Sequence, residues 1–168
     1  FKFIQNNYLF YKSQNKNEDD ENENKDENKD EIFDSIIIAN RDIDDVIIPP
    51  EIKFISSYAF EECLKLKSVN FSSDSNLQNI GYYSFLKSSL ETIIIPSSLT
   101  TISNGAFKDC QNLKSIIFDQ NSKLKYISDD SFFGCQKLEN IEMSKNLELE
   151  MIGNNSFNGC YSLIKISI

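Results

Sequence analysis

The stretch Leu99–Phe118, LTTISNGAFKDCQNLKSIIF, decides the fold of this chain. Its apolar residues fall at fixed intervals, and polar residues fill nearly all the positions between them. The anchors are Leu99, Ile102, Phe107, Cys110, Leu113, Ile116 and Phe118. The same arrangement of apolar residues recurs before and after this stretch, so the chain is built from repeats.

The repeats extend from Ile52 onward, and one phenylalanine marks each of them. These phenylalanines are 25, 22, 25 and 25 residues apart, and they are Phe60, Phe85, Phe107, Phe132 and Phe157. The second coil is short because it lacks one residue between Phe85 and Leu90, and because the join that follows it, 96–98, is also short. A period of this length fits one turn of a solenoid rather than a pair of helices.

Two spacings within the repeat predict local structure. Ile116 and Phe118 alternate with outward residues, as in a strand with one buried face. Phe107, Cys110 and Leu113 step by three, which is typical of a 3₁₀ or short α-helical turn. The predicted fold is therefore an α/β repeat solenoid, right-handed, with one short strand and one 3₁₀ or short helical turn in each coil.

The remaining sequence divides into three parts. Residues 1–13 form an isolated N-terminal segment with the composition of a strand. Residues 14–31 carry nine acidic residues, three lysines and no apolar residue, which predicts a disordered acidic linker. Residues 32–168 form the repeat domain, with a partial coil at 32–48 and five coils at 49–168.

These anchors resemble the BspA-like leucine-rich repeat family, whose pattern reads roughly I-P-x-x-L-x-x-I-G-x-x-A-F-x-x-C-x-x-L-x-x-V-x-F. The stretch from Ile95 to Phe118 matches nearly throughout, with Ser103 in the glycine position, and the resemblance covers Ile43 to Ile168. The second coil departs most, since Ser88 replaces the cysteine. The resemblance implies a leucine-rich-repeat surface antigen that acts in cell adhesion, and it carries over no catalytic residue.

Composition excludes several classes of function. The formal net charge of −9 argues against a nucleic-acid partner, and the absence of histidine excludes histidine-based catalysis and histidine-ligated metal. The sequence contains no phosphate-binding loop and no nucleophile motif. We therefore expect no enzyme, no cofactor and no metal site, although an acidic Ca²⁺ site at Asp129–Asp130 remains an alternative.

Four cysteines share one repeat position: Cys63, Cys110, Cys135 and Cys160. Neighbouring coils would bring their Cα atoms within disulfide range. All four should nevertheless point the same inward way, and free cysteine is a good small core residue. Reduced core thiols are therefore expected, with a disulfide or a metal site as alternatives.

The outward strand positions are the candidate binding residues because the repeat leaves them free to vary. The partner-binding candidates are Asn70, Thr92, Ile94, Ser115, Ile117, Asn140 and Glu142. Ile94 and Ile117 should lie side by side on the sheet, and adjacent exposed apolar residues can mark a contact patch. The alternative is that they reflect strand propensity alone.

The sequence thus predicts a non-catalytic binding module that recognises a host or matrix protein, or a glycan, through the sheet face of the solenoid. The expected location is the cell surface or the extracellular space, with no membrane insertion within this chain. An intracellular scaffold for protein–protein interaction, in the cytoplasm, is the alternative. The last coil ends without a polar cap, so an end-to-end contact is expected there.

Overall fold

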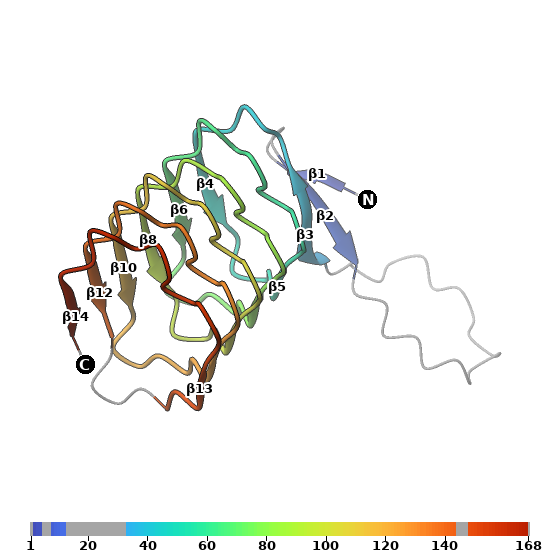
Figure 1. Cartoon of the computed structure of the whole chain (residues 1–168). Helices are drawn as coiled ribbons and strands as arrows, with labels where there is room; N and C mark the ends of the chain where they lie inside the picture. Colours follow the sequence, from blue (N-terminus) through green and yellow to red (C-terminus); the bar gives the residue numbers. More distant parts are fainter. Residues whose placement is uncertain (1, 5–7, 13–32, 144–147, 168) are drawn as a thin grey trace, which may run out of the picture.

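The computed structural model describes residues 2–4, 8–12, 33–143 and 148–167. Within these residues the chain forms fourteen strands and no helix, and it winds into a solenoid of parallel coils (Figure 1). The strands are β1 (Lys2–Ile4), β2 (Tyr8–Lys12), β3 (Phe33–Ala39), β4 (Asp45–Ile48), β5 (Phe54–Ile55), β6 (Ser68–Phe71), β7 (Asn79–Ile80), β8 (Thr92–Ile95), β9 (Thr101–Ile102), β10 (Ser115–Phe118), β11 (Tyr126–Ile127), β12 (Asn140–Glu142), β13 (Met151–Ile152) and β14 (Lys165–Ser167).

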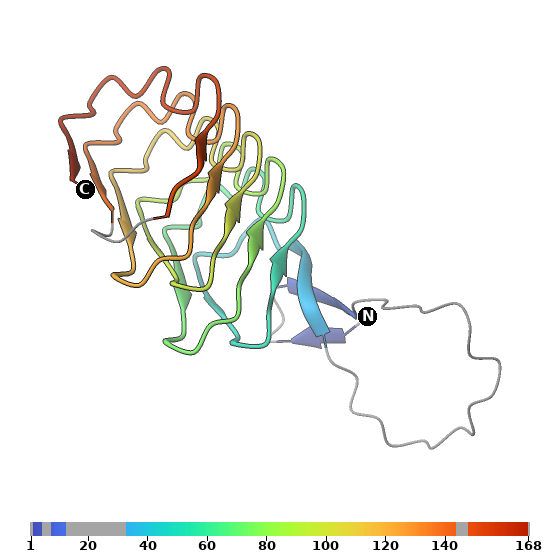
Figure 2. The ribbon, with the colours of Figure 1, turned by 90° about the horizontal axis from the view of Figure 1, so that it is seen from below.

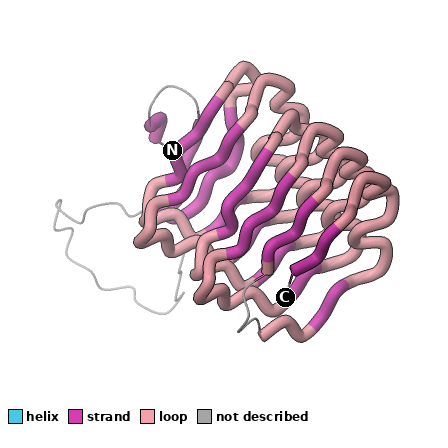
Figure 3. Tube along the Cα trace, turned by 90° about the vertical axis from the view of Figure 1, so that its left-hand side faces the viewer, coloured by secondary structure: helices cyan, strands magenta, loops and turns pink. Residues whose placement is uncertain are grey.

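One side of the solenoid is a parallel sheet in the order β14-β12-β10-β8-β6-β4, here called the long-strand sheet (Figure 3). Each coil contributes one strand, and repeat positions stay in register from coil to coil. Ile116 pairs with Ile93 on one side and with Ile141 on the other. All three side chains are buried, so the predicted inward columns of this sheet are present.

A second sheet follows the opposite side of the coils (Figure 2), in the order β1-β2-β3-β5-β7-β9-β11-β13. We call it the short-strand sheet because from β5 onward each coil adds only two residues to it. The prediction of a single strand in each coil is therefore wrong. The second strand is the pair that ends in the isoleucine anchor, such as Thr101–Ile102, and a pair is too short to show a period.

The predicted helical turn is also wrong, and the chain is an all-β solenoid rather than an α/β repeat. Hydrogen bonds between residues three apart do occur, as from the Cys110 amide to the Phe107 carbonyl oxygen at 3.2 Å. However, Gly105 has φ of 61° and Asp109 has φ of 57°, so left-handed residues interrupt the segment. A 3₁₀ helix needs consecutive residues with negative φ, and successive tight turns form instead.

The core is a column of phenylalanine rings between the two sheets. Successive rings from Phe60 to Phe157 lie 4.9, 5.1, 5.1 and 5.3 Å apart and are nearly parallel. Phe60, Phe85, Phe107 and Phe132 are completely buried. The repeated phenylalanines thus form a continuous spine, and its spacing follows the distance between parallel strands.

The N-terminal strands extend the short-strand sheet. β1 pairs antiparallel with β2, and β2 pairs antiparallel with β3, which is itself parallel to β5. The segment 1–13 was expected to be isolated, but β2 supplies backbone partners along the edge of β3 that would otherwise be open. The predicted acidic linker at 14–31 lies outside the described residues, and the domain boundaries remain predictions.

Candidate functional site

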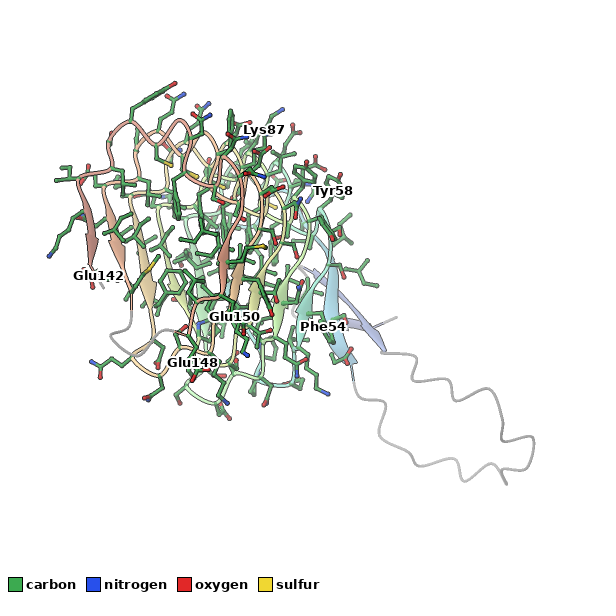
Figure 4. The ribbon with its side chains drawn as sticks, turned by 60° about the horizontal axis from the view of Figure 1, so that its bottom comes forward. Phe54, Tyr58, Lys87, Glu142, Glu148 and Glu150 are labelled. Atoms are coloured by element: carbon green, nitrogen blue, oxygen red, sulfur yellow. The ribbon has the colours of Figure 1, made fainter. Side chains whose placement is uncertain are left out.

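The long-strand sheet presents its outward side chains in two columns, and all seven candidate binding residues lie there. Asn70, Thr92, Ile94 and Glu142 are exposed, whereas Ser115, Ile117 and Asn140 are half-buried. The structure thus brings these residues onto one face of β6, β8, β10 and β12. Figure 4 shows Glu142 at the end of this face toward the last coil.

Apolar residues occupy the middle of this face. Ile94 on β8 is paired directly with Ile117 on β10, and the Ile94 side chain is 56% exposed. Glu142 on β12 is the next partner of Ile117, so a charge follows the two isoleucines in the column. An exposed apolar pair with polar neighbours is the composition of a small contact patch.

Polar contacts between coils fix the edges of the face. Between coils, the Ser68 hydroxyl donates to Asp45 Oδ1 at 2.7 Å, and within β6 the Asn70 side-chain amide donates to Ser68 Oγ at 3.2 Å. Just before β8 and β10, Lys114 Nζ and Glu91 Oε2 lie 3.2 Å apart. These contacts hold neighbouring strands in one register, so the face is a rigid surface rather than a set of independent loops.

The short second coil leaves a groove along one edge of this face, where the long strands begin. Two open depressions of about 490 and 380 Å³ meet there. Both are lined by Leu64, Ser89 and Asn112, which belong to three successive coils, and Leu64 is 66% exposed. The missing residue between Phe85 and Leu90 explains the groove, because Ser89 lies on a shorter turn than its neighbours on either side.

A stacked pair of tyrosines, one exposed and one half-buried, forms a second feature, which sequence analysis missed. Tyr58 and Tyr83 stack with ring centroids 5.5 Å apart, and both have positive φ, 61° and 52°. Gly105, Asp130 and Asn155 hold the same repeat position in the later coils, and these are the residue types that adopt positive φ most readily. Figure 4 shows Tyr58 and Lys87 on the tight turns that lead from the short-strand sheet to the long-strand sheet, and Phe54 on the short-strand sheet itself. A tyrosine where later coils carry Gly, Asp or Asn is the signal that could have identified this pair.

The cysteine column lies inside the coil, and its four thiols are free. Cys110 Sγ donates to the Phe85 carbonyl oxygen at 2.9 Å, and Cys135 Sγ donates to the Phe107 carbonyl oxygen at 3.1 Å. Burial raises the pKa of Cys110 to about 12 and also raises the pKa of Cys135. Protonated thiols that donate to the preceding coil are structural groups, not nucleophiles.

Chemistry-bearing clusters are sparse in the part of the chain that the structure describes. No three His, Cys, Asp or Glu residues gather there as metal ligands would. Asp129, an alternative Ca²⁺ ligand, instead accepts a hydrogen bond from the Asn154 amide at 2.6 Å. The described residues also include no helix of the length and hydropathy needed to cross a bilayer.

Comparison with known proteins identifies these coils as leucine-rich repeats. The model of the BspA type leucine-rich repeat region matches residues 30–164 in six copies. No curated protein sequence matches the chain at a significant level.

Three solved structures show the same solenoid. The pneumococcal vaccine antigen PcpA is 32% identical with a TM-score of 0.67, over 73% of this chain and 30% of PcpA. A leucine-rich repeat protein from Eubacterium ventriosum is 20% identical with a TM-score of 0.70, over 82% of this chain and 38% of that one. Another from Bacteroides ovatus is 24% identical with a TM-score of 0.58, over 80% and 41%. This chain therefore spans less than half the length of each of these structures.

Proposed function

This chain belongs to the BspA type leucine-rich repeat family, and from that premise we propose that it is a non-catalytic, adhesin-like binding module. Its ligand is a host or matrix protein, or a glycan, at a cell surface. The binding surface is the outward face of the long-strand sheet, centred on β8 and β10. Proteins built from such repeats are suited to protein binding because stacked coils present a broad, rigid face.

The observation that supports this proposal is the pairing of Ile94 with Ile117 on that face. The fold does not require either side chain, because Ile93 and Ile116 already fill the core beneath them. Exposed apolar residues that are adjacent, rather than scattered, favour contact with a partner. Asn70, Thr92, Ser115, Asn140 and Glu142 would supply a polar rim around this centre.

A surface location is supported by similarity to PcpA, which is described as a vaccine antigen. The alternative, an intracellular scaffold, would use the same sheet face. Protease treatment of intact cells separates the two proposals. Loss of the repeat domain from intact cells supports the surface module, whereas protection until the cells are lysed supports the scaffold.

The sheet-face proposal can be tested with immobilised fibronectin, laminin and collagen as probes. The variant carries Ile94→Asp and Ile117→Asp. The matched control carries Phe54→Asp and Tyr126→Asp, two side chains on the short-strand sheet that are each 37% exposed. Circular dichroism and thermal unfolding confirm that both variants are folded.

We expect the sheet-face variant to lose at least about tenfold in affinity for any probe that the natural chain binds, since a central contact pair contributes about 2 kcal/mol or more. The control should keep its affinity. Equal binding by the natural chain and the folded sheet-face variant would overturn the assignment of the face.

An end-to-end contact at the last coil also stays a proposal. Ile152 and Ile166 are 51% and 47% exposed, although their counterparts Ile127 and Ile141 are buried. Sedimentation velocity tests the contact. A monomer that persists at high protein concentration would contradict it, and Ile152→Lys should abolish any dimer that forms.

A further inference from the structure

A small cavity of about 140 Å³ opens at the end of the long strands, between β6 and β8. We call it the corner notch. Its walls include Asn70, Phe71, Ser72, Ile94, Ser97 and Asp119, which come from three successive coils. It lies at the opposite end of β8 from the groove at Ser89, and it shares Asn70 and Ile94 with the candidate sheet face.

The sequence explains why the coils separate at this corner. After β10, the Asp119 amide donates to the Ile95 carbonyl oxygen at 3.1 Å and continues the ladder by one residue. Pro96 holds the corresponding position after β8, and proline has no N–H to donate. The pairing of β6 with β8 accordingly includes Val69 with Ile93 but does not extend to Asn70 or Phe71.

Unequal joins between coils enlarge the gap. The join 96–98 has fewer residues than 72–76 before it and 119–123 after it. The long join 72–76 packs on the preceding coil, since the Asn76 amide donates to the Pro50 carbonyl oxygen at 3.0 Å. The long join after it packs on 96–98, with the Lys123 amide donating to the Ser97 carbonyl oxygen at 2.9 Å. The notch therefore opens on one side of the short join only.

The notch combines an apolar wall with polar side chains. Phe71 is only half-buried, although its counterparts Ile48, Ile95 and Phe118 are buried, so part of this aromatic side chain is open to the notch. The Ser72 hydroxyl oxygen is buried and has no hydrogen-bond partner among the described residues. This oxygen is closed off from the notch, so the polar side chains open to a ligand are those of Asn70, Ser97 and Asp119.

Asp119 adds an acceptor at the rim. Its Oδ1 accepts the Asn121 amide at 2.9 Å, which fixes the carboxylate, while Oδ2 has no partner in the described part of the chain. Lysine and arginine are absent from the described lining, so the notch does not favour an anion. Its volume is below the roughly 300–1,000 Å³ of sites for drug-sized ligands, so it suits one small ring.

We infer that the corner notch binds a single hexopyranose unit, the end of a glycan. The C–H face of the sugar packs on Phe71 and Ile94, and its hydroxyls bond to Ser97, Asn70 and the Asp119 carboxylate. An apolar wall with a few convergent polar groups is the general composition of a small-ligand site. The inference rests on the proposed function in that it names a ligand class for the same face.

The test uses the whole chain and the methyl glycosides of glucose, galactose, mannose and N-acetylglucosamine as probes, followed by amide chemical shifts in NMR spectra. The blocking variant is Ser73→Tyr, since Ser73 is exposed and lines the notch. The matched control is Asp74→Tyr, which places the same side chain on the neighbouring exposed residue outside the lining.

We expect at least one glycoside to shift the amides of Ser72, Ser97 and Asp119 with a dissociation constant near the millimolar range. Ser73→Tyr should weaken this binding at least tenfold, and Asp74→Tyr should leave it unchanged. The inference fails if no glycoside shifts these amides, or if Ser73→Tyr binds as well as the natural chain.

The two proposals can fail separately. If the glycosides do not bind but the Ile94→Asp, Ile117→Asp variant still loses its matrix-protein partner, the sheet face stands and the sugar site falls. If Ser73→Tyr weakens only matrix-protein binding, the notch receives a protein side chain, and the sugar assignment is again overturned. If the glycosides bind as expected while the sheet-face variant keeps every partner, the sugar site stands alone.

Discussion

The Phe107 ring lies parallel to the Phe85 ring of the preceding coil, with centroids 5.1 Å apart and an angle of 2° between the planes. Phe132 stacks on the other side of Phe107 at the same distance. Because every interior phenylalanine has two such neighbours, removing one ring opens a cavity that is lined by the rings of the coils on both sides.

We expect Phe107→Ala to lower the free energy of unfolding by about 3–5 kcal/mol, the usual range for a fully buried phenylalanine. Phe157→Ala is the matched control, since Phe157 holds the same repeat position but is only half-buried. Its effect should be less than about half as large because its burial is incomplete. Denaturant titration measures both, and equal losses would contradict a spine that is strongest in the interior.

Gly105 is a position where a side chain does not fit. Its φ is 61°, and a Cβ atom there would collide with the ring of Tyr83. Gly105→Ala should therefore destabilise the chain by about 1–3 kcal/mol. In the background of Tyr83→Ala, the same change should be less destabilising because only the backbone term remains. A double-mutant cycle measures this difference, and strict additivity would show that the ring is not the obstacle.

The buried thiols predict a loss of stability at alkaline pH. Burial raises the pKa of Cys110 to about 12, whereas an unfolded thiol titrates near about 8.5. The unfolded chain therefore releases its proton first, so the contribution is complete below about pH 8.5 and is lost as the pH rises toward 12. At pH 10 the loss from this thiol is about 2 kcal/mol.

Cys110→Ser isolates that contribution. Serine does not ionise in this range, and Ser88 already occupies the same repeat position, 3.4 Å from Cys110 Sγ. Denaturant titrations at pH 8 and pH 10 should show a smaller decline for the variant than for the natural chain. Identical declines would mean that the Cys110 thiol does not couple to unfolding.

The ion pair between Lys108 and Asp130 joins two coils at 2.9 Å, and the Lys108 ammonium also lies 4.7 Å from the centre of the Phe133 ring. Asp130→Asn keeps a residue type that tolerates the φ of 54° at this position and removes only the charge. We expect a loss of about 0.2–1 kcal/mol, diminished by added salt.

A more exposed pair provides the comparison. Lys65 and Asp42 are 62% and 78% exposed at the same N–O distance of 2.9 Å, so Asp42→Asn should have a smaller effect than Asp130→Asn. A larger effect at Asp42 would contradict the role of partial burial.

The core could be predicted from the sequence because its anchors repeat. Ile102, Phe107 and Leu113 recur in the other coils, and five copies in register identify the side chains that face inward. The turns could not be predicted in the same way. Asp109 and Gly134 share a repeat position and a positive φ, but one is a charged residue, so no single residue type signals the turn. The three-residue steps therefore indicated a helix where left-handed residues interrupt the chain.

The candidate site was predictable only in part. Alternation along β8 and β10 was enough to place Ile94 opposite Ile117. The corner notch depends instead on the backbone N–H that Pro96 lacks and on the lengths of the joins beside it. A pattern of side chains does not record a missing hydrogen bond between coils, so only the structure reveals the half-buried Phe71.

The short second coil indicates that the number of residues in a coil determines the local shape of the solenoid surface. Its phenylalanine, Phe85, is 22 residues before the next one, Phe107, whereas the other repeat phenylalanines are 25 residues apart. Two deletions, one at each end of a single strand, leave the core columns intact while creating a depression on either side. A coil of this kind would be transplantable: moved to another place in a regular array, between joins of the usual length, it should carry both depressions with it.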